Sequence, residues 1–178
     1  RSVGQEVIYA QEDGKFLLFG PMVDATSKKN LTEATKERLS RIDFKDLPLE
    51  LAVKVVKGDG SRVFATFEDP NCGYCKKLHE SLRHVTNYTL YSFLTPILSE
   101  DSKAKAKAIW CSADRASALV NWMESSTISM SSSCDAPIGK VLELAQKLGV
   151  KGTPTLFFSD GKRTPGYIPE QQLESMLN

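Results

Sequence analysis

The chain has 178 residues, of which 41% are hydrophobic and 25% are charged. This composition is typical of a globular domain with a small appendage, and it excludes an intrinsically disordered chain. The formal net charge of +1 excludes a strongly basic field that would hold nucleic acid, and no apolar run approaches the roughly eighteen residues of a membrane-spanning helix.

The N-terminal segment predicts a β-hairpin with strands at 6–10 and 15–19, because Asp13-Gly14 between two apolar runs is a strong turn signal. A two-stranded hairpin is only marginally stable in water, so we expect it to pack on the rest of the chain or on a second subunit. The first residues contain neither Met nor an apolar signal core. We therefore expect a mature form from which a signal peptide has been removed.

The next segment predicts an amphipathic helix over 31–42, with Asn30 as its N-cap and Glu33 three residues later. Its apolar stripe consists of Leu31, Ala34, Leu39 and Ile42. The expected organisation is a hairpin segment at 1–26, a linker helix at 27–46 and a main domain at 47–178.

The main domain predicts an α/β structure, because β-rich runs alternate with helical periodicity. The expected strands are 51–57, 62–67, 88–95, 154–158 and 163–167. The expected helices start near Cys72 and cover 100–124, 137–148 and 170–177, with Gly149 as a C-cap, Pro169 before the last helix and a Ser-rich loop at 125–133.

The segment Cys72-Gly73-Tyr74-Cys75 stands where an apolar strand gives way to a helix. Free amides and the partial positive charge of the first helical turn lower the pKa of a thiol placed there, and the thiolate is the attacking species in disulfide exchange. We expect Cys72 to be the exposed nucleophile and Cys75, one turn further on, to be more buried and to resolve mixed disulfides. Gly73 leaves room for a substrate chain, and Tyr74 offers an amphipathic contact.

Two other interpretations of the cysteine pair stay open: an inert disulfide and half of a zinc site. His79 and His84 supply suitable ligand types, but zinc sites usually separate their Cys and His pairs by about a dozen residues. We therefore expect no metal, with His79 a partly buried packing residue and His84 at the surface.

Gly152-Thr153-Pro154 precedes the apolar run 155–158, and proline suits the first position of a strand because it cannot donate to the sheet. A cis bond would leave the Thr153 backbone free to pair with a substrate strand. The residues alone favour a trans bond.

Several motifs together resemble the thioredoxin superfamily and, within it, the DsbC-type periplasmic disulfide isomerases. The first set is Phe67-x-Asp69-x2-Cys72-Gly73-Tyr74-Cys75-x2-Leu78-His79-Glu80 with Gly152-Thr153-Pro154. The second set is Lys107–Cys111, Ser133-Cys134-Asp135, Leu148-Gly149-Val150 and Pro165-Gly166-Tyr167. The segment from Asp13 to Asp24 also resembles the end of that family's N-terminal dimerisation domain, and we expect the first half of that domain to be missing from this chain.

The resemblance implies a thioredoxin-like fold with a helical insertion at about 99–149, and it implies roles for individual residues. Cys72 would be the nucleophile, Cys75 the resolving cysteine, and Thr153-Pro154 a cis-proline loop. Cys111 and Cys134 would form a structural disulfide, which the loop-entropy model values at about 3.4 kcal/mol; two unrelated buried thiols are the alternative.

The implied activity is protein disulfide isomerisation in the bacterial periplasm without a cofactor. The implied partners are misfolded disulfide-containing proteins, a membrane reductant of the DsbD type and a second copy of the chain. The short N-terminal segment leaves dimerisation open. The alternatives are a monomeric disulfide oxidase or reductase of the same fold, a chaperone-like peptide-binding module and a zinc-binding interaction protein.

Overall fold

The computed structural model describes residues 7–40, 42–130 and 134–177, apart from the side chains of residues 37, 39 and 40. The chain divides into two compact units, one ending at Ile42 and one beginning at Asp43. Each unit is described by itself below. The division predicted from the sequence into segments 1–26, 27–46 and 47–178 stays a prediction.

The first unit contains the predicted hairpin. Strand β1 (Ile8–Ala10) pairs antiparallel with β2 (Leu17–Phe19), and Gly14 takes a φ of +69° in the turn between them. All three residues of β2 are exposed, and Phe16 and Phe19 have exposed fractions of 70% and 67%. The apolar side chains of this hairpin therefore find little cover within the described chain.

Helix α1 (Leu31–Ser40) follows in the same unit. The predicted cap is confirmed, because the amide of Glu33 donates to Asn30 Oδ1 at 3.1 Å. The predicted apolar stripe is wrong for Leu31 and Ala34, which are exposed, while the side chain of Leu39 lies outside the description. Hydrogen bonds join the helix to β1 and to the loop after the hairpin instead. The buried Thr32 hydroxyl accepts from the amide of Met22 and shares a hydrogen bond with the Tyr9 hydroxyl, both at 2.7 Å.

The second unit is built on a five-stranded sheet in the order β3-β5-β4-β6-β7. Its strands are β3 (Val53–Lys57), β4 (Arg62–Glu68), β5 (Tyr88–Leu94), β6 (Thr155–Phe158) and β7 (Arg163–Pro165). Strands β4 and β5 run parallel, and the other neighbouring pairs are antiparallel. All five predicted strands are confirmed, with ends shifted by a few residues.

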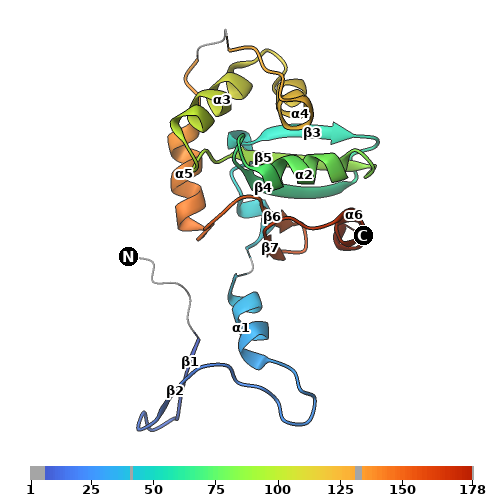
Figure 1. Ribbon diagram of the computed structural model, residues 1–178. Coiled ribbons are helices and arrows are strands. Elements are labelled where there is room, and N and C mark those ends of the chain that lie inside the picture. The colour runs from blue at the N-terminus through green and yellow to red at the C-terminus, as the bar shows by residue number, and fades with distance from the viewer. Residues whose placement is uncertain (1–6, 41, 131–133, 178) are drawn as a thin grey trace. The chain divides into compact units, whose positions relative to one another are not determined.

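Helices pack around this sheet (Figure 1). They are α2 (Gly73–Leu82), α3 (Glu100–Cys111), α4 (Arg115–Ser125), α5 (Ile138–Lys147) and α6 (Glu170–Leu177), and two short 3₁₀ turns at Phe44–Asp46 and Leu49–Leu51 precede the sheet. Helix α2 is the crossover that joins the parallel pair β4 and β5, as a parallel connection requires. Helices α3, α4 and α5 form an insertion between β5 and β6, and α4 packs on α2 and β3.

The core lies between the sheet and its helices. The rings of Phe67 on β4 and Phe93 on β5 stack with their centroids 4.7 Å apart, and both side chains are fully buried. Burying a phenylalanine stabilises the fold by about 1.5–3 kcal/mol, so this pair fixes the end of β4 firmly. The loop that leads to Cys72 begins at that end.

The predicted single helix over 100–124 is wrong, because the chain forms two helices there. Ser112 takes an extended conformation (φ −68°, ψ 146°) that ends α3. Asp114 then starts α4 by accepting from the Ser117 amide at 3.0 Å and from the Ser117 hydroxyl at 2.7 Å. An Asp that caps the third residue after it is a helix-start signal, and it outweighs the helical periodicity around it. The Ser-rich loop begins one residue later than predicted, because Ser125 ends α4, and residues 131–133 lie outside the description.

Candidate active site

Cys72 is the N-cap of α2, directly after the loop that leaves β4. The side chains of Cys72 and Cys75 are free thiols, with exposed fractions of 7% and 0%. Cys75 is more buried, as predicted, but the expectation of an exposed Cys72 is wrong in degree. The loop that contains Thr153 covers it: Cys72 Sγ lies 3.2 Å from the backbone carbonyl oxygen of Thr153, to which it donates when protonated.

The Thr153–Pro154 peptide bond is cis, so the trans bond favoured by the residues alone is wrong and the one implied by the resemblance is present. Pro154 is buried, and its carbonyl accepts from the amide of Gly166 at 2.7 Å. The Thr155 hydroxyl donates to the carbonyl of Gly152 at 2.7 Å. These bonds hold the loop so that the Thr153 backbone faces the sulfur of Cys72.

The surroundings of Cys72 favour its thiolate. A hydrogen bond from the Cys75 thiol lowers the pKa of Cys72 to about 5, against partial burial, with further contributions from the Thr153 side chain and from the amides of Cys75 and Tyr74. The two amides belong to the first turn of α2, where backbone donors have no helical partner. Cys72 therefore carries a negative charge at neutral pH.

The surroundings of Cys75 have the opposite effect. Burial raises the pKa of Cys75 far above its usual value, and its hydrogen bond to Cys72 and the negative charge of Glu68 raise it further. A protonated thiol thus lies beside an ionised one. Because the pKa values of the two cysteines are shifted in opposite directions, Cys72 can act as the nucleophile and Cys75 as the resolving cysteine.

Glu68, the last residue of β4, is fully buried and pairs with His79 of α2. His79 Nε2 lies 2.7 Å from Glu68 Oε2, and the Thr66 hydroxyl donates to the other carboxylate oxygen. Burial alone would raise the pKa of Glu68, but the charge and hydrogen bond of His79 and the Thr66 hydroxyl outweigh it and lower that pKa. The prediction of a merely packing His79 is incomplete, because the residue is 2% exposed and bound to a carboxylate.

The remaining predicted residues lie around this centre. Gly73 is exposed, and a Cβ built on it would meet no atom within 4 Å. Tyr74 is 60% exposed, with the ammonium of Lys77 5.3 Å from the centre of its ring. His84 is exposed, as expected. Within the described residues, no cluster of three or more His, Cys, Asp or Glu side chains could hold a metal ion.

The second cysteine pair forms a disulfide between Cys111, the last residue of α3, and Cys134, with the Cα atoms 5.5 Å apart. It closes a span of 23 residues that contains α4. Cys111 packs at the edge of the core, while Cys134 is exposed. The disulfide thus ties the insertion together.

Sequence reasoning missed Glu68 and the contacts of the loop before Cys72. The signal for Glu68 was available, since a carboxylate ends a strand whose residues 63–67 are apolar except for Thr66, and His79 stands one helical turn after Cys75. In the loop, Asp69 is fully buried and accepts from the amides of Ile97 and Leu98 at 2.8 and 2.9 Å. No local sequence pattern predicts that Asp69 binds residues almost thirty positions further along the chain.

The arrangement can carry out thiol–disulfide exchange. An ionised sulfur at a helix start can attack a disulfide, the protonated sulfur next to it can later displace the product, and the Thr153 backbone beside them can pair with an extended peptide. Within the described residues, none of the helices is both long enough and apolar enough to cross a lipid bilayer.

Comparisons with known proteins agree with this chemistry. A family model described as a thioredoxin-like domain matches residues 49–178, and one described as the disulfide bond isomerase protein N-terminal domain matches residues 2–33. The probable thiol:disulfide interchange protein DsbC of Bordetella pertussis is 46% identical over 98% of this chain. The thiol:disulfide interchange protein DsbC of Escherichia coli K12 is 31% identical over 97% of this chain and 73% of its own length. The chain spans 63% of the length of the Bordetella relative.

Solved structures confirm the predicted fold class. A disulfide interchange protein from Neisseria gonorrhoeae matches with a TM-score of 0.71 and 39% identity, over 74% of this chain and 96% of that one. The catalytic domain of Proteus mirabilis ScsC matches with a TM-score of 0.62 over 80% of this chain and 93% of that one, and at 20% identity it supports the fold alone. The α/β domain with a helical insertion is therefore a thioredoxin-like fold.

Proposed function

Because this chain belongs to the DsbC-type thiol:disulfide interchange proteins of the thioredoxin superfamily, we propose that it acts as a protein disulfide isomerase. The observation that carries the proposal is the split in acidity between Cys72 and Cys75. An isomerase needs a sulfur that attacks a disulfide and also leaves it again, and a thiol of low pKa does both.

The reaction begins when the Cys72 thiolate attacks one sulfur of an incorrect disulfide in a misfolded protein. The substrate disulfide breaks, a mixed disulfide with Cys72 forms, and the other substrate sulfur leaves as a thiolate. Another substrate thiolate then attacks the substrate sulfur of the mixed disulfide. The new pairing forms and the Cys72 thiolate is released, so the complete cycle involves no net oxidation or reduction.

Cys75 provides an escape when the substrate stalls. Its sulfur loses a proton and attacks Cys72 Sγ, and the bond between Cys72 and the substrate breaks. The substrate sulfur leaves as a thiolate that takes up a proton, and a Cys72–Cys75 disulfide forms. A dithiol reductant must then return two electrons, and we propose a membrane protein of the DsbD type for this step. The backbone of Thr153 with Pro154, the open surface at Gly73 and the ring of Tyr74 would hold the substrate chain.

The proposed substrates are disulfide-containing proteins of the bacterial periplasm, where thiols are oxidised and wrong pairings arise. Cys111 and Cys134 would serve as a structural disulfide, which persists in such a compartment. Neither a metal nor an organic cofactor enters the proposed chemistry, since the two thiols of the CxxC segment carry both electrons.

We further propose that a second copy of the chain covers the hairpin of the first unit. Phe16, Leu17, Leu18 and Phe19 are each at least half exposed in the single chain, and the segment matches the N-terminal domain model of disulfide isomerases. Sedimentation equilibrium tests this: a dimer is expected for the native chain and a monomer for Phe16→Glu with Phe19→Glu. A native chain that sediments as a monomer would contradict it.

Refolding of a scrambled multi-disulfide protein in glutathione buffer tests the function. The native chain should restore the activity of the substrate and Cys72→Ala should not, while Cys75→Ala should keep much of the effect because shuffling needs only Cys72. A chaperone-like binding module predicts full recovery with Cys72→Ala. An oxidase or reductase, which the low pKa of Cys72 also suits, predicts that Cys75→Ala is as inactive as Cys72→Ala.

A further inference from the structure

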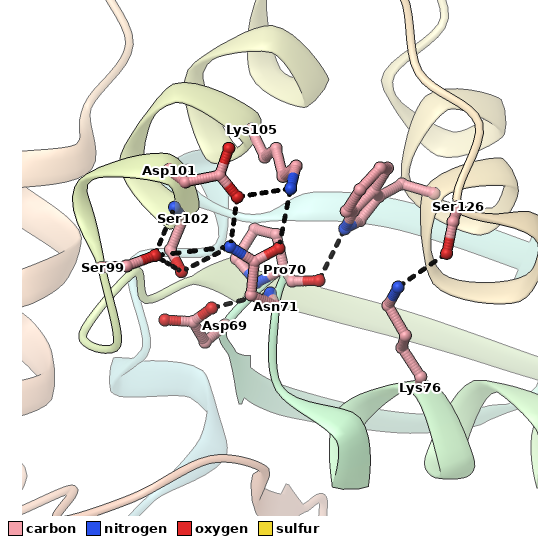
Figure 2. Close-up of polar contacts among 10 residues, drawn as sticks. Asp69, Pro70, Asn71, Lys76, Ser99, Asp101, Ser102, Lys105 and Ser126 are labelled. Carbon is pink, nitrogen blue, oxygen red and sulfur yellow. Dashed lines mark hydrogen bonds and ion pairs between the residues drawn. The ribbon is translucent and has the colours of Figure 1, made fainter.

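The three residues before Cys72 are held by the helical insertion rather than by the sheet alone. Figure 2 shows side chains of α3 and the end of α4 converging on the loop formed by Asp69, Pro70 and Asn71. The same loop connects to the nucleophile, because the amide of Cys72 donates to the carbonyl of Asp69 at 3.0 Å. A displacement of this loop therefore changes the position of Cys72.

Asn71 joins the loop to the first turns of α3. Its side-chain amide donates to Asp101 Oδ2 at 2.7 Å and to the Ser102 hydroxyl at 3.1 Å. Its side-chain oxygen accepts from the ammonium of Lys105 at 3.1 Å, and its backbone amide donates to Asp69 Oδ1 at 2.8 Å. Every polar group of this side chain is thus used in one orientation, although Asn71 is only half-buried.

Trp122 joins the loop to α4. Its indole N–H donates to the carbonyl of Pro70 at 2.6 Å, and the residue is 8% exposed. The ammonium groups of Lys76 and Lys105 lie 4.6 and 4.4 Å from the centre of the ring. Lys76 also donates to the Ser126 hydroxyl at 2.7 Å. The indole is therefore fixed between α2 and α3 and has little freedom to leave the Pro70 carbonyl.

We propose that Trp122 and Asn71 are positioning residues for thiol–disulfide exchange, which hold the Pro70–Asn71 turn so that the first amides of α2 face the sulfur of Cys72. The proposal rests on the proposed function, since it concerns the reactivity of Cys72. It gives the insertion a part in the chemistry besides tying the fold together.

The physical reason is the short range of the interactions that stabilise the thiolate. The donors are the Cys75 thiol, the Thr153 side chain and the amides of Cys75 and Tyr74. Hydrogen bonds to a charged group weaken steeply when the donor angle or distance changes, and a displacement of about 1 Å at a reacting atom can cost two orders of magnitude in rate. A loop released from Pro70 or Asn71 lets Cys72 move relative to these donors.

The charged side chains around the Pro70–Asn71 turn do not themselves account for the lowered pKa of Cys72. Lys76 and Lys105 face the ring of Trp122, and Lys105 also pairs with Asp101. Glu68 of β4 acts on Cys75. The causes that lower the pKa of Cys72 are hydrogen bonds rather than charged side chains, so the insertion acts on Cys72 through the position of the loop.

The test is the pH dependence of the alkylation of Cys72 by iodoacetamide in the reduced full chain, with the modified residue identified by mass spectrometry. Trp122→Phe keeps an aromatic ring but removes the N–H that binds Pro70, together with part of the buried ring volume. We expect its rate–pH profile to move to higher pH by at least about 0.5 pH unit, with about a twofold or greater loss of rate at pH 5.

Trp110→Phe is the matched control. Trp110 lies in α3 with an exposed fraction of 7%, and its indole nitrogen has no hydrogen bond in the described part of the chain. The same substitution there should lower the thermal midpoint without moving the alkylation profile. Asn71→Ala is the second variant, because replacing a half-buried residue disturbs the core less than replacing a buried one, and its profile should move in the same direction as that of Trp122→Phe.

The proposal is overturned if Trp122→Phe and Asn71→Ala both keep the native profile, or if Trp110→Phe moves it as far as they do. The first result would make the cluster a stabilising contact only, and the second would make the shift a general effect of loosened packing. A native chain whose Cys72 reacts no faster than glutathione would instead overturn the proposed function, and with it the proposal that depends on it.

Discussion

The two cysteine pairs of this chain place the same chemical group in opposite settings. Cys72 and Cys75 are separate thiols at the start of a helix, where neighbouring donors stabilise one as a thiolate and burial keeps the other protonated. Cys111 and Cys134 are joined at the end of a helix, where the bond ties two segments of an insertion. The difference shows that the local donors and burial, not the cysteine itself, decide whether sulfur reacts or holds the fold together.

The largest expected contrast between the pairs is in activity. Cys72→Ala should lower the rate of exchange with a model disulfide peptide by about a thousandfold or more, because the attacking atom is lost. Cys111→Ala combined with Cys134→Ala should stay within about twofold of the native rate, since neither sulfur touches the reacting atoms. Stopped-flow measurement of the peptide exchange at pH 7 compares them, and a large loss in the double variant would erase the distinction between the pairs.

For stability, by contrast, we expect the Cys111–Cys134 pair to matter more than its small effect on activity suggests. Loss of the Cys111–Cys134 bond should lower the free energy of unfolding by about 3 kcal/mol, because the unfolded chain regains the freedom of the closed loop. Urea denaturation of the double variant measures this. Fully reduced native protein is the matched control and should unfold at the same urea concentration as the reduced double variant. An unchanged midpoint on losing the bond would show that it has no structural role.

Removing the carboxylate below the reactive pair should have a smaller effect. Glu68→Gln leaves His79 buried without its acidic partner, so we expect a loss of about 2 kcal/mol in the free energy of unfolding. It should also make the Cys75 thiol easier to ionise, because the negative charge of Glu68 raises the pKa of Cys75. Glu80→Gln, an exposed change in α2, is the control and should alter neither property.

The last expected effect is a pH dependence of stability that only the reduced active-site pair produces. The folded state lowers the pKa of Cys72 from its usual 9.0 to about 5. Between those values the unfolded chain binds a proton that the folded chain does not, so stability rises with pH across this window and is lost as pH falls towards 5.

Differential scanning calorimetry of the reduced protein at several pH values measures this rise as an increase in the thermal midpoint relative to Cys72→Ala. Equal slopes for the two proteins would mean that the thiolate is not stabilised by folding. The Cys111–Cys134 pair supplies an internal comparison, because a disulfide has no proton to lose.

The sequence was informative where the signal is local. The hairpin turn at Asp13-Gly14, the Asn30 cap and the strand-to-helix placement of Cys72 all follow from residues that are neighbours in the chain, and the structure contains each of them. The fold class also came from the combination of motifs, because each motif fixes one turn or strand end of the same architecture.

Features that depend on distant partners could not be predicted in this way. The cover over Cys72 comes from Thr153, and the anchor of Pro70 comes from Trp122, which is 52 residues further along the chain. The break between α3 and α4 was missed for a different reason, since helical periodicity on both sides masked the local capping signal of Asp114. The apolar stripe of α1 was misjudged because packing, not periodicity, decides what is buried.

The central claim is that Cys72 is a thiolate at a pH where ordinary thiols are not, and its alkylation rate at pH 6 tests this most directly. With a pKa of about 5, Cys72 is about nine-tenths ionised at pH 6, against roughly 0.3% of a thiol with a pKa near 8.5. The lower nucleophilicity of a more acidic thiolate offsets much of this gain, so the account predicts that Cys72 reacts with iodoacetamide about tenfold faster than glutathione. A rate equal to or below that of glutathione would contradict it.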